Sequence, residues 1–370
     1  MKDRLKAYSL KCLHGEKRGL LARLWLAFLA FLSFFYWAGM RVRSGLYRKD
    51  WLSRHRLPCR VISVGNLVAG GTGKTPFIEY LALALKREGR KVAVLIRGYK
   101  GRAEGSMTLV SNGHQVLGKY PWVGDEAYLL ARNLQGIPVL MGVDRYKAGL
   151  FAVKELGVEE VLLDDGFQHL ALHRDLDILL MDGLNPFGFG YLLPRGLLRE
   201  PLNSIARADV LVLTRADLTQ ETGPLREELR RFNQGAPILL ACHRPSGLLT
   251  LNGERALDVE ALQGKAIVAF SGIANPRSFE STLESLGAKV LKHLVFPDHH
   301  PYSMGDLEAI LEKGEDLRAE MVLTTEKDAV RLLDLPINPG IPLYALRVRF
   351  SLIEGEDALE RILGVSLGNP

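Results

Sequence analysis

Short apolar runs alternate with longer amphipathic stretches from residue 60 onward. Because short runs rich in Val, Ile and Leu are typical of buried strands, we expect strands at 60–64, 92–96, 138–141, 161–164, 177–181 and 210–214. The stretches between them predict helices at 74–87, 125–133 and 146–156. Strands that alternate with helices are typical of a mostly parallel sheet covered by helices, so the pattern predicts an α/β fold.

A second set of apolar runs lies at 237–241, 266–271, 289–295 and 321–325, after a charged stretch at 218–231 that predicts a helix. The length of 370 residues favours two domains over one. We therefore expect an N-terminal segment over 1–58, a first α/β lobe over 59–215 and a second α/β lobe over 216–370. Residues after about 335 show no recognisable motif.

The N-terminal segment contains an uncharged run, LWLAFLAFLSFFYWAGM, of 17 residues. A helix needs roughly 20 apolar residues to span a bilayer. Seven residues of the run are aromatic and Lys and Arg flank both ends, so we favour a helix that lies in the membrane interface. A spanning helix stays open as an alternative. Tyr36 and Trp37 stand where the cleavage site of a signal peptide needs small residues, which argues against a signal peptide. The cationic flanks argue against a buried core helix.

Charge divides the chain in the same way. Residues 1–60 hold 14 Lys and Arg against three acidic residues, a balance of +11, whereas the rest of the chain has a balance of −5 and the whole chain +6. The basic segment therefore predicts an acidic partner such as anionic lipid, and the acidic body argues against nucleic acid. The three cysteines form no CxxC pair, which argues against a disulfide framework and a cysteine metal site.

A glycine-rich loop follows the first expected strand, in the sequence VGNLVAGGTGKTP. Glycines let the backbone N–H groups curl toward phosphate oxygens, and the start of the next helix favours anions. Lys74 is expected to reach the β- and γ-phosphates, and the Thr75 hydroxyl to bind Mg²⁺. Val68 occupies the first glycine position of the usual P-loop pattern. The expected nucleotide-binding residues are Val68, Ala69, Gly70, Gly71, Thr72, Gly73, Lys74 and Thr75.

Two further acidic motifs could belong to this site. The strand at 161–164 ends in Asp164 and Asp165, and either carboxylate could hold the Mg²⁺ of a P-loop. Asp125 follows Gly124 at the start of an expected helix. From the residues alone, we interpret Asp125 as a cap that accepts a backbone N–H.

The motifs VGNLVAGGTGKTP, RGYKGR, VGDEAYLL, DDGFQH, LLPRGLLREPL, FPDHHPY and TTEKDAVRL occur in this order. In this order, behind a basic aromatic N-terminus, they resemble the tetraacyldisaccharide 4′-kinase family, the lipid A kinases of Gram-negative bacteria. The resemblance runs to about residue 331. It implies transfer of the γ-phosphoryl group of ATP to the 4′-hydroxyl of a tetraacylated glucosamine disaccharide 1-phosphate. It also implies Mg²⁺, a monotopic location at the cytoplasmic face of the inner membrane, and no obligate protein partner.

The resemblance changes the interpretation of Asp125, which it implies is the catalytic base. It implies that a histidine of the FPDHHPY motif assists, which gives His299 beside Asp298 and leaves His300 as an alternative. Such an Asp–His pair is expected to increase the basicity around the carboxylate.

Arg199 and Glu200 match residues near the γ-phosphate and the metal, and Asp164 and Asp165 match the acidic pair. Gln168 and His169 are neighbouring motif members. If the phosphate loop and His299 belong to different lobes, we expect hinge closure that excludes water.

The alternative function is a membrane-associated P-loop GTPase or ATPase without a lipid substrate. Its support is the sequence TRAD at 214–217, which loosely resembles the guanine-reading pattern [NT]-K-x-D. Arg215 replaces the lysine of that pattern. The additional carboxylates at Asp125 and Asp164 favour the kinase over a nucleotide-binding module without a substrate.

Overall fold

The computed structural model describes residues 8–9, 11–13, 15–98, 107–219, 221–336 and 340–367. The RGYKGR motif lies mostly outside the described residues. The chain forms two compact units, each assembled from separate segments. Unit 1 contains Met1–Lys74, Leu163–Cys242 and Leu352–Gly364, and unit 2 contains Thr75–Leu162, His243–Ser351 and Val365–Pro370. The lobe boundaries expected at 59–215 and 216–370 stay a prediction.

Unit 1 is built on parallel strands. β1 (Arg60–Asn66), β6 (Leu176–Asp182), β7 (Val210–Thr214) and the start of β8 (Ile238–Leu249) pair in the order β8–β7–β6–β1. Every residue of β7 is buried, as expected for a parallel strand covered on both faces. Because the strands are parallel, Asn66, Asp182 and Thr214 lie at the carboxyl edge, next to the glycine-rich loop.

A helix and a 3-10 turn complete the core of unit 1. The turn at Leu202–Arg207 buries Ile205, and α6 (Thr222–Phe232) buries Leu229 in the same hydrophobic cluster. We expected this helix to begin at 218, but α6 begins at Thr222. Pro224 lies in its first turn, where a missing N–H is tolerated and a fixed φ favours the helix.

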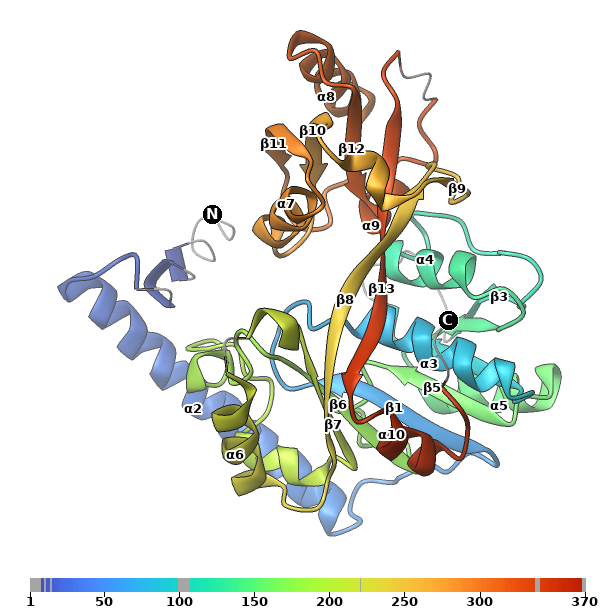
Figure 1. Ribbon diagram of the computed structural model, residues 1–370. Coiled ribbons are helices and arrows are strands. Elements are labelled where there is room, and N and C mark those ends of the chain that lie inside the picture. The colour runs from blue at the N-terminus through green and yellow to red at the C-terminus, as the bar shows by residue number, and fades with distance from the viewer. Residues whose placement is uncertain are drawn as a thin grey trace. The chain divides into compact units, whose positions relative to one another are not determined.

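The apolar N-terminal run forms one long helix, α2 (Leu20–Arg48), shown in blue in Figure 1. Its buried residues, Ala22, Leu29, Ser33 and Tyr47, follow a heptad-like spacing and therefore form one narrow stripe. By length and composition α2 could cross a membrane. Most of its apolar side chains are exposed, among them Phe31, Phe34 and Phe35 at 60%, 59% and 57%.

Unit 2 contains two groups of strands. In the first, β2 (Val92–Ile96) pairs in parallel with β4 (Val139–Met141), which pairs antiparallel with β3 (Thr108–Ser111). The helices of this part are α3 (Lys74–Arg87), α4 (Asp125–Asn133) and α5 (Arg145–Leu156). β5 (Glu160–Asp164) follows them along the chain.

The second group is parallel, in the order β11–β10–β12–β13. Its strands are β10 (Ala266–Ser271), β11 (Lys289–Val295), β12 (Met321–Thr325) and β13 (Leu343–Glu354), with α7 (Pro276–Ser285), α8 (Met304–Asp316) and α9 (Glu326–Val330) between them. A short strand, β9 (Arg255–Leu257), pairs with the end of β8, and α10 (Glu356–Leu363) follows β13.

The predicted fold class is confirmed: mostly parallel strands alternate with helices, behind an N-terminal apolar helix. The sequence missed β3, β9, β13 and α10. β13 was hidden because Arg347 and Arg349 interrupt its apolar residues and a proline-rich stretch precedes it. Tertiary packing gives Arg347 a partner that the sequence does not reveal, Glu79 of α3.

Candidate active site

The glycine-rich loop lies between β1 and α3, which begins at Lys74. Asn66 is fully buried, and its side-chain amide donates to the carbonyl oxygens of Val68 at 2.7 Å and Gly70 at 3.4 Å. The Thr214 hydroxyl donates to the carbonyl oxygen of Thr72 at 3.1 Å. The ends of β1 and β7, which lie on either side of β6, thus fix the loop, and the positive φ of Gly70 and Gly73 (133° and 79°) requires glycine there.

Val68 replaces a glycine because its backbone is extended. It forms an isolated antiparallel bridge with Leu198, and the next amide, of Ala69, donates to the carbonyl oxygen of Leu197 at 2.7 Å. The loop is therefore bound at its start to the LLPRGLLREPL segment. This contact brings the two motifs together within unit 1.

Two cations converge on Asp165. Arg199 Nη1 donates to both carboxylate oxygens, at 2.7 and 2.8 Å, and Lys74 Nζ lies 3.5 Å from Oδ1. We call Lys74, Asp165 and Arg199 the phosphate-loop cluster. Asp165 adopts a left-handed backbone, with φ of 53°. The sequence placed these residues in one site, and the structure brings them together.

The donors expected to hold Mg²⁺ are oxygen ligands of the type that this ion prefers. Asp164 and Thr75 are buried, with 5% and 7% exposure. Glu200 is also buried and forms two hydrogen bonds with Arg207, at 2.7 and 3.1 Å, so Arg207 would compete with a metal for it. Within the described residues, no three His, Cys, Asp or Glu side chains form a ready metal site. This fits Mg²⁺, which binds through one or two carboxylates together with substrate phosphates.

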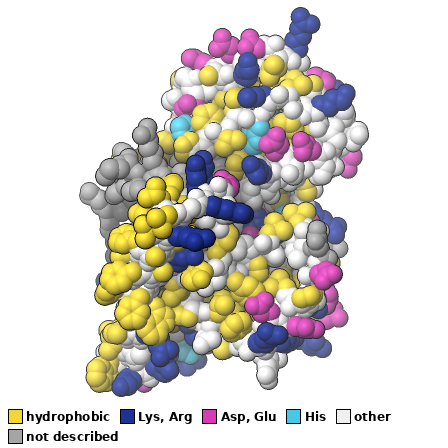
Figure 2. All heavy atoms as spheres, turned by 90° about the vertical axis from the view of Figure 1, so that its left-hand side faces the viewer, with side chains coloured by type: hydrophobic (Ala, Val, Ile, Leu, Met, Phe, Trp, Pro, Cys, Tyr) yellow, Lys and Arg dark blue, Asp and Glu magenta, His cyan; other side chains and the backbone are white. Residues whose placement is uncertain are grey.

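Helix α2 is anchored to the same unit. The Ser33 hydroxyl donates to the carbonyl oxygen of Leu192 and accepts from the amide of Arg195, both at 3.0 Å. The Tyr36 hydroxyl donates to the carbonyl oxygen of Arg199 at 2.9 Å. Figure 2 shows the face of the molecule on which α2 is exposed. Hydrophobic side chains form a band on this face, and Lys and Arg side chains gather beside it. The buried stripe of α2 thus contacts the segment that carries Arg199.

Asp125 is not the helix cap that the residues alone indicated. Gly124 is the N-cap residue of α4, and no side chain caps the helix. Asp125 Oδ1 accepts only a local hydrogen bond, from the Glu126 amide at 3.0 Å. Its Oδ2 atom accepts from His299 Nδ1 and from Arg331 Nε, each at 2.8 Å, and also from Arg331 Nη2. We call Asp125, His299 and Arg331 the Asp125 cluster; all three belong to unit 2.

The electrostatics of this cluster differ from the expected increase in basicity. Burial alone would raise the pKa of Asp125, but the hydrogen bond from His299 and the charge of Arg331 hold it well below its usual range. The hydrogen bond to Asp125 raises the pKa of His299, although burial opposes this. Asp125 is therefore a well-ionised, weakly basic carboxylate, because its partners favour the charged form.

The structure distinguishes the two histidines. His299 contacts Asp125, whereas His300 Nε2 lies 3.2 Å from Asp306 and its ring stacks on Phe296. Asp298 Oδ1 lies 3.9 Å from His299 Nε2, at the edge of ion-pair range.

The sequence interpretation missed the residues that support this cluster: Tyr302, Lys327, Asp328 and Arg331. All lie within the motifs FPDHHPY and TTEKDAVRL, so the motif letters were the available signal. Lys327 Nζ donates to Glu126 at 2.7 Å. The Tyr302 hydroxyl donates to Asp328 at 3.0 Å.

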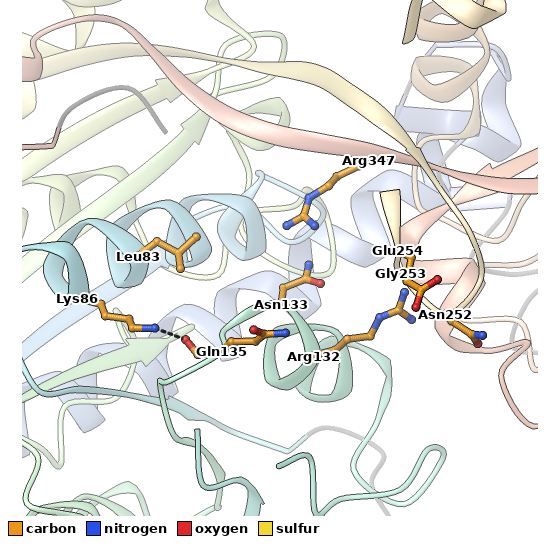
Figure 3. A pocket seen from close by; sticks show the side chains of 9 residues that line it. All are labelled: Leu83, Lys86, Arg132, Asn133, Gln135, Asn252, Gly253, Glu254 and Arg347. Atoms are coloured by element: carbon orange, nitrogen blue, oxygen red, sulfur yellow. Dashed lines mark hydrogen bonds between the residues drawn. The ribbon is translucent and has the colours of Figure 1, made fainter. Parts of the chain in front are cut away.

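A polar hollow of about 410 Å³ lies elsewhere in unit 2 (Figure 3). Its cations are already bound: Lys86 donates to the Gln135 carbonyl oxygen, Arg132 to that of Leu251, and Arg347 to Glu79. These contacts make it a junction between α3, α4 and β13.

Comparisons with known proteins agree with the motifs. A family model described as tetraacyldisaccharide-1-P 4′-kinase matches residues 25–367. A tetraacyldisaccharide 4′-kinase of Syntrophus aciditrophicus is 44% identical over 315 residues, which are 82% of this chain and 83% of that protein. Another, of Halothermothrix orenii, is 38% identical over 370 residues, 95% of this chain and 96% of that protein.

A solved structure is also similar. It is LpxK from Aquifex aeolicus in complex with ATP, with a TM-score of 0.73 and 36% sequence identity over 90% of this chain and 96% of that chain.

Proposed function

The chain belongs to the tetraacyldisaccharide-1-phosphate 4′-kinase family, and we propose that the phosphate-loop cluster and the Asp125 cluster each serve its reaction. The protein is an ATP-dependent phosphotransferase. It transfers the γ-phosphoryl group to the 4′-hydroxyl of a tetraacylated glucosamine disaccharide 1-phosphate. We assign roles to individual side chains below.

The convergence of Lys74 and Arg199 on Asp165, beside a strand–loop–helix phosphate loop, carries this proposal. Lys74 binds the β- and γ-phosphates of ATP, and Arg199 neutralises charge on the transferred group. Thr75 and the Asp164–Asp165 pair would hold Mg²⁺, with Glu200 as a further oxygen donor, and a bound Mg²⁺ would neutralise charge at the phosphates.

Asp125 orients the sugar hydroxyl and accepts its proton as the oxygen bonds to the γ-phosphorus and the bond from that phosphorus to ADP breaks. Its Oδ2 is occupied by His299 and Arg331, whereas Oδ1 accepts only one hydrogen bond from the Glu126 amide and can accept another. Phosphoryl transfer depends mainly on positioning and charge neutralisation, so a weakly basic carboxylate is sufficient. His299 acts with Asp125, and Asp298 supports the histidine from its other ring nitrogen.

Closure of the two lobes, expected from the sequence, stays a prediction. The GTPase alternative has little support, because Arg215 pairs with Asp182 and its side chain also donates to the Gly71 carbonyl oxygen at 3.3 Å. The residue that would replace the guanine-reading lysine thus supports the phosphate loop.

We propose that α2 holds the protein flat on the cytoplasmic face of the inner membrane. Ser33 and Tyr36, near the middle of α2, hydrogen-bond to the 192–199 segment. A spanning helix would place this polar segment in the hydrocarbon, where unsatisfied backbone groups are costly. The exposed apolar side of α2, with its basic flanks, instead suits an interface that contains both anionic lipid and the lipid substrate.

A direct assay tests the function. The full-length protein in detergent is incubated with Mg²⁺, the tetraacyl disaccharide 1-phosphate and either ATP or GTP, and the product is analysed by mass spectrometry and ³¹P NMR. We expect a new 4′-phosphate with ATP and none with Lys74→Ala. Efficient transfer from GTP but not ATP, or nucleotide hydrolysis without a phosphorylated lipid, would contradict the proposal.

A further inference from the structure

We propose that Arg331 is a positioning residue of the kinase, which fixes Asp125 by one carboxylate oxygen and leaves the other to receive the sugar hydroxyl. This inference rests on the proposed role of Asp125. It concerns a residue that does not itself touch the substrate, and the contacts within unit 2 carry it.

The guanidinium of Arg331 is divided between two carboxylates. Nε and Nη2 donate to Asp125 Oδ2, while Nη1 donates to Asp328 Oδ1 and to the Gly272 carbonyl oxygen, at 2.8 and 2.9 Å. The side chain of Arg331 is 1% exposed, and that of Asp328 is fully buried. Because the guanidinium is planar, fixing its Nη1 edge also fixes the edge that holds Asp125.

Asp328 is itself held by the ends of two strands. It accepts hydrogen bonds from the Gly272 amide and the Tyr302 hydroxyl at Oδ1, each at 3.0 Å, and from the Thr325 hydroxyl at Oδ2, at 2.6 Å. Gly272 follows β10, and Thr325 ends β12. Arg331 thus fixes the position of Asp125 relative to the carboxyl edge of this parallel sheet.

A purely structural arginine needs only its pair with Asp328. The additional donors reach Asp125 at the same oxygen that His299 contacts, so the hydrogen bonds collect on Oδ2. Among the described residues, the neighbouring Glu126 amide is the donor that reaches Oδ1. The asymmetry orients one lone-pair direction of Oδ1 for a substrate hydroxyl, and a shift of about 1 Å in such a group can cost about 100-fold in rate.

Arg331 also sets the charge around Asp125. Among the described residues, the other charged or titratable groups that face this site are His299 with Asp298, Glu126 paired with Lys327, Asp328, Tyr302 and Tyr120. Burial raises the pKa of Asp125, and the positive charge of Arg331 is among the opposing causes that lower it. Arg331 also opposes the rise that Asp125 causes in the pKa of His299. Removing the charge therefore moves both pKa values upward.

The test compares Arg331→Met and Arg331→Lys in the full-length protein, by kcat, KM for ATP and the pH dependence of kcat/KM. We expect Arg331→Met to lower kcat about 100-fold, with KM for ATP changed less than about threefold. We expect the acid limb of its pH profile to move to higher pH, because the pKa of Asp125 rises when the positive charge is lost. Arg331→Lys restores the charge but not the planar fork, so the acid limb should return while kcat recovers only in part.

Arg331→Met leaves the buried carboxylate of Asp328 without its arginine. The change is therefore also made in a protein that carries Asp328→Asn, and this double variant is compared with the Asp328→Asn single variant. Thermal unfolding checks that each variant is folded. A folded Met variant whose acid limb stays at the reference position, or whose kcat stays within about threefold, would overturn the inference. Asp125→Ala separates the two proposals. If this variant remains active, the proposed role of Asp125 is wrong. If it is inactive while the acid limb of Arg331→Met stays at the reference position, only the positioning inference is wrong.

Discussion

Asp125 shows how the surroundings of one side chain decide its chemistry. Its place after a glycine at a helix start predicts a cap, yet its carboxylate turns toward His299 and Arg331. These partners come from segments about 170 and 200 residues further along the chain. The carboxylate is thereby ionised and oriented, and it is weakly basic for the same reason. We expect its contribution to catalysis to come from positioning.

The corresponding prediction concerns turnover and ATP binding. Asp125→Asn should lower kcat by about 100-fold or more, because the amide cannot accept as a carboxylate does and disturbs the contact with Arg331. The affinity for ATP, measured by calorimetry, should change little. Glu126→Gln, a carboxylate change at the next position, should lower kcat far less. Equal losses in both variants would indicate a general effect on α4.

Helices and strands meet at a second buried acidic group, Glu326, at the start of α9. Asn133 of α4 approaches it at 3.5 Å and Arg347 of β13 at 4.0 Å, while Glu79 of α3 binds both of these residues. Burial raises the pKa of Glu326 to about 7, with Arg347 opposing and the charge of Glu79 adding to the rise. The four elements thus share one partly neutralised junction.

This junction predicts a pH-dependent stability. A carboxyl whose folded-state pKa is raised binds more protons when folded, so its stabilisation is present below its ordinary pKa near 4.5 and is lost as pH rises through about 7. The free energy of unfolding of Glu326→Gln, relative to that of wild type, should therefore increase by about 3 kcal/mol when the pH is raised from 5 to 8. Denaturant unfolding at both pH values measures this. The exposed control Glu312→Gln should show no such trend, and a parallel pH dependence of Glu326→Gln and wild type would contradict the assignment.

At the scale of the whole molecule, the proposed membrane attachment and the assigned chemistry belong to different segments of the chain. The balance of +11 in residues 1–60 belongs largely to the segment around α2, and the acidic remainder carries the side chains assigned to catalysis. Deleting residues 1–45 would also remove Ser33, Tyr36 and Arg43, which hydrogen-bond near the phosphate loop. Surface substitutions on α2 therefore test attachment more cleanly than a truncation.

We expect Phe31→Ser, Phe34→Ser and Phe35→Ser together to weaken binding to vesicles of phosphatidylglycerol and phosphatidylcholine about tenfold or more. Binding of the wild type should also weaken as NaCl rises, because salt screens the attraction between Lys or Arg and anionic lipid. Flotation assays measure both effects. The control Val295→Ser changes an equally exposed side chain, 57%, outside α2 and should bind as wild type does. Unchanged flotation of the triple variant would place the membrane contact elsewhere.

The sequence by itself determined the local structure and much of the chemistry. Periodicity located most of the parallel strands and most helices, because buried parallel strands are nearly continuous apolar runs. The glycine-rich loop predicted a phosphate site, and the ordered motifs indicated the family. Tertiary structure alone decided which side chains meet: His299 rather than His300 at Asp125, Arg331 behind both, and α2 bound to the 192–199 segment. These contacts join positions distant in the chain, and hydrophobic patterning cannot specify the partner of a buried charge.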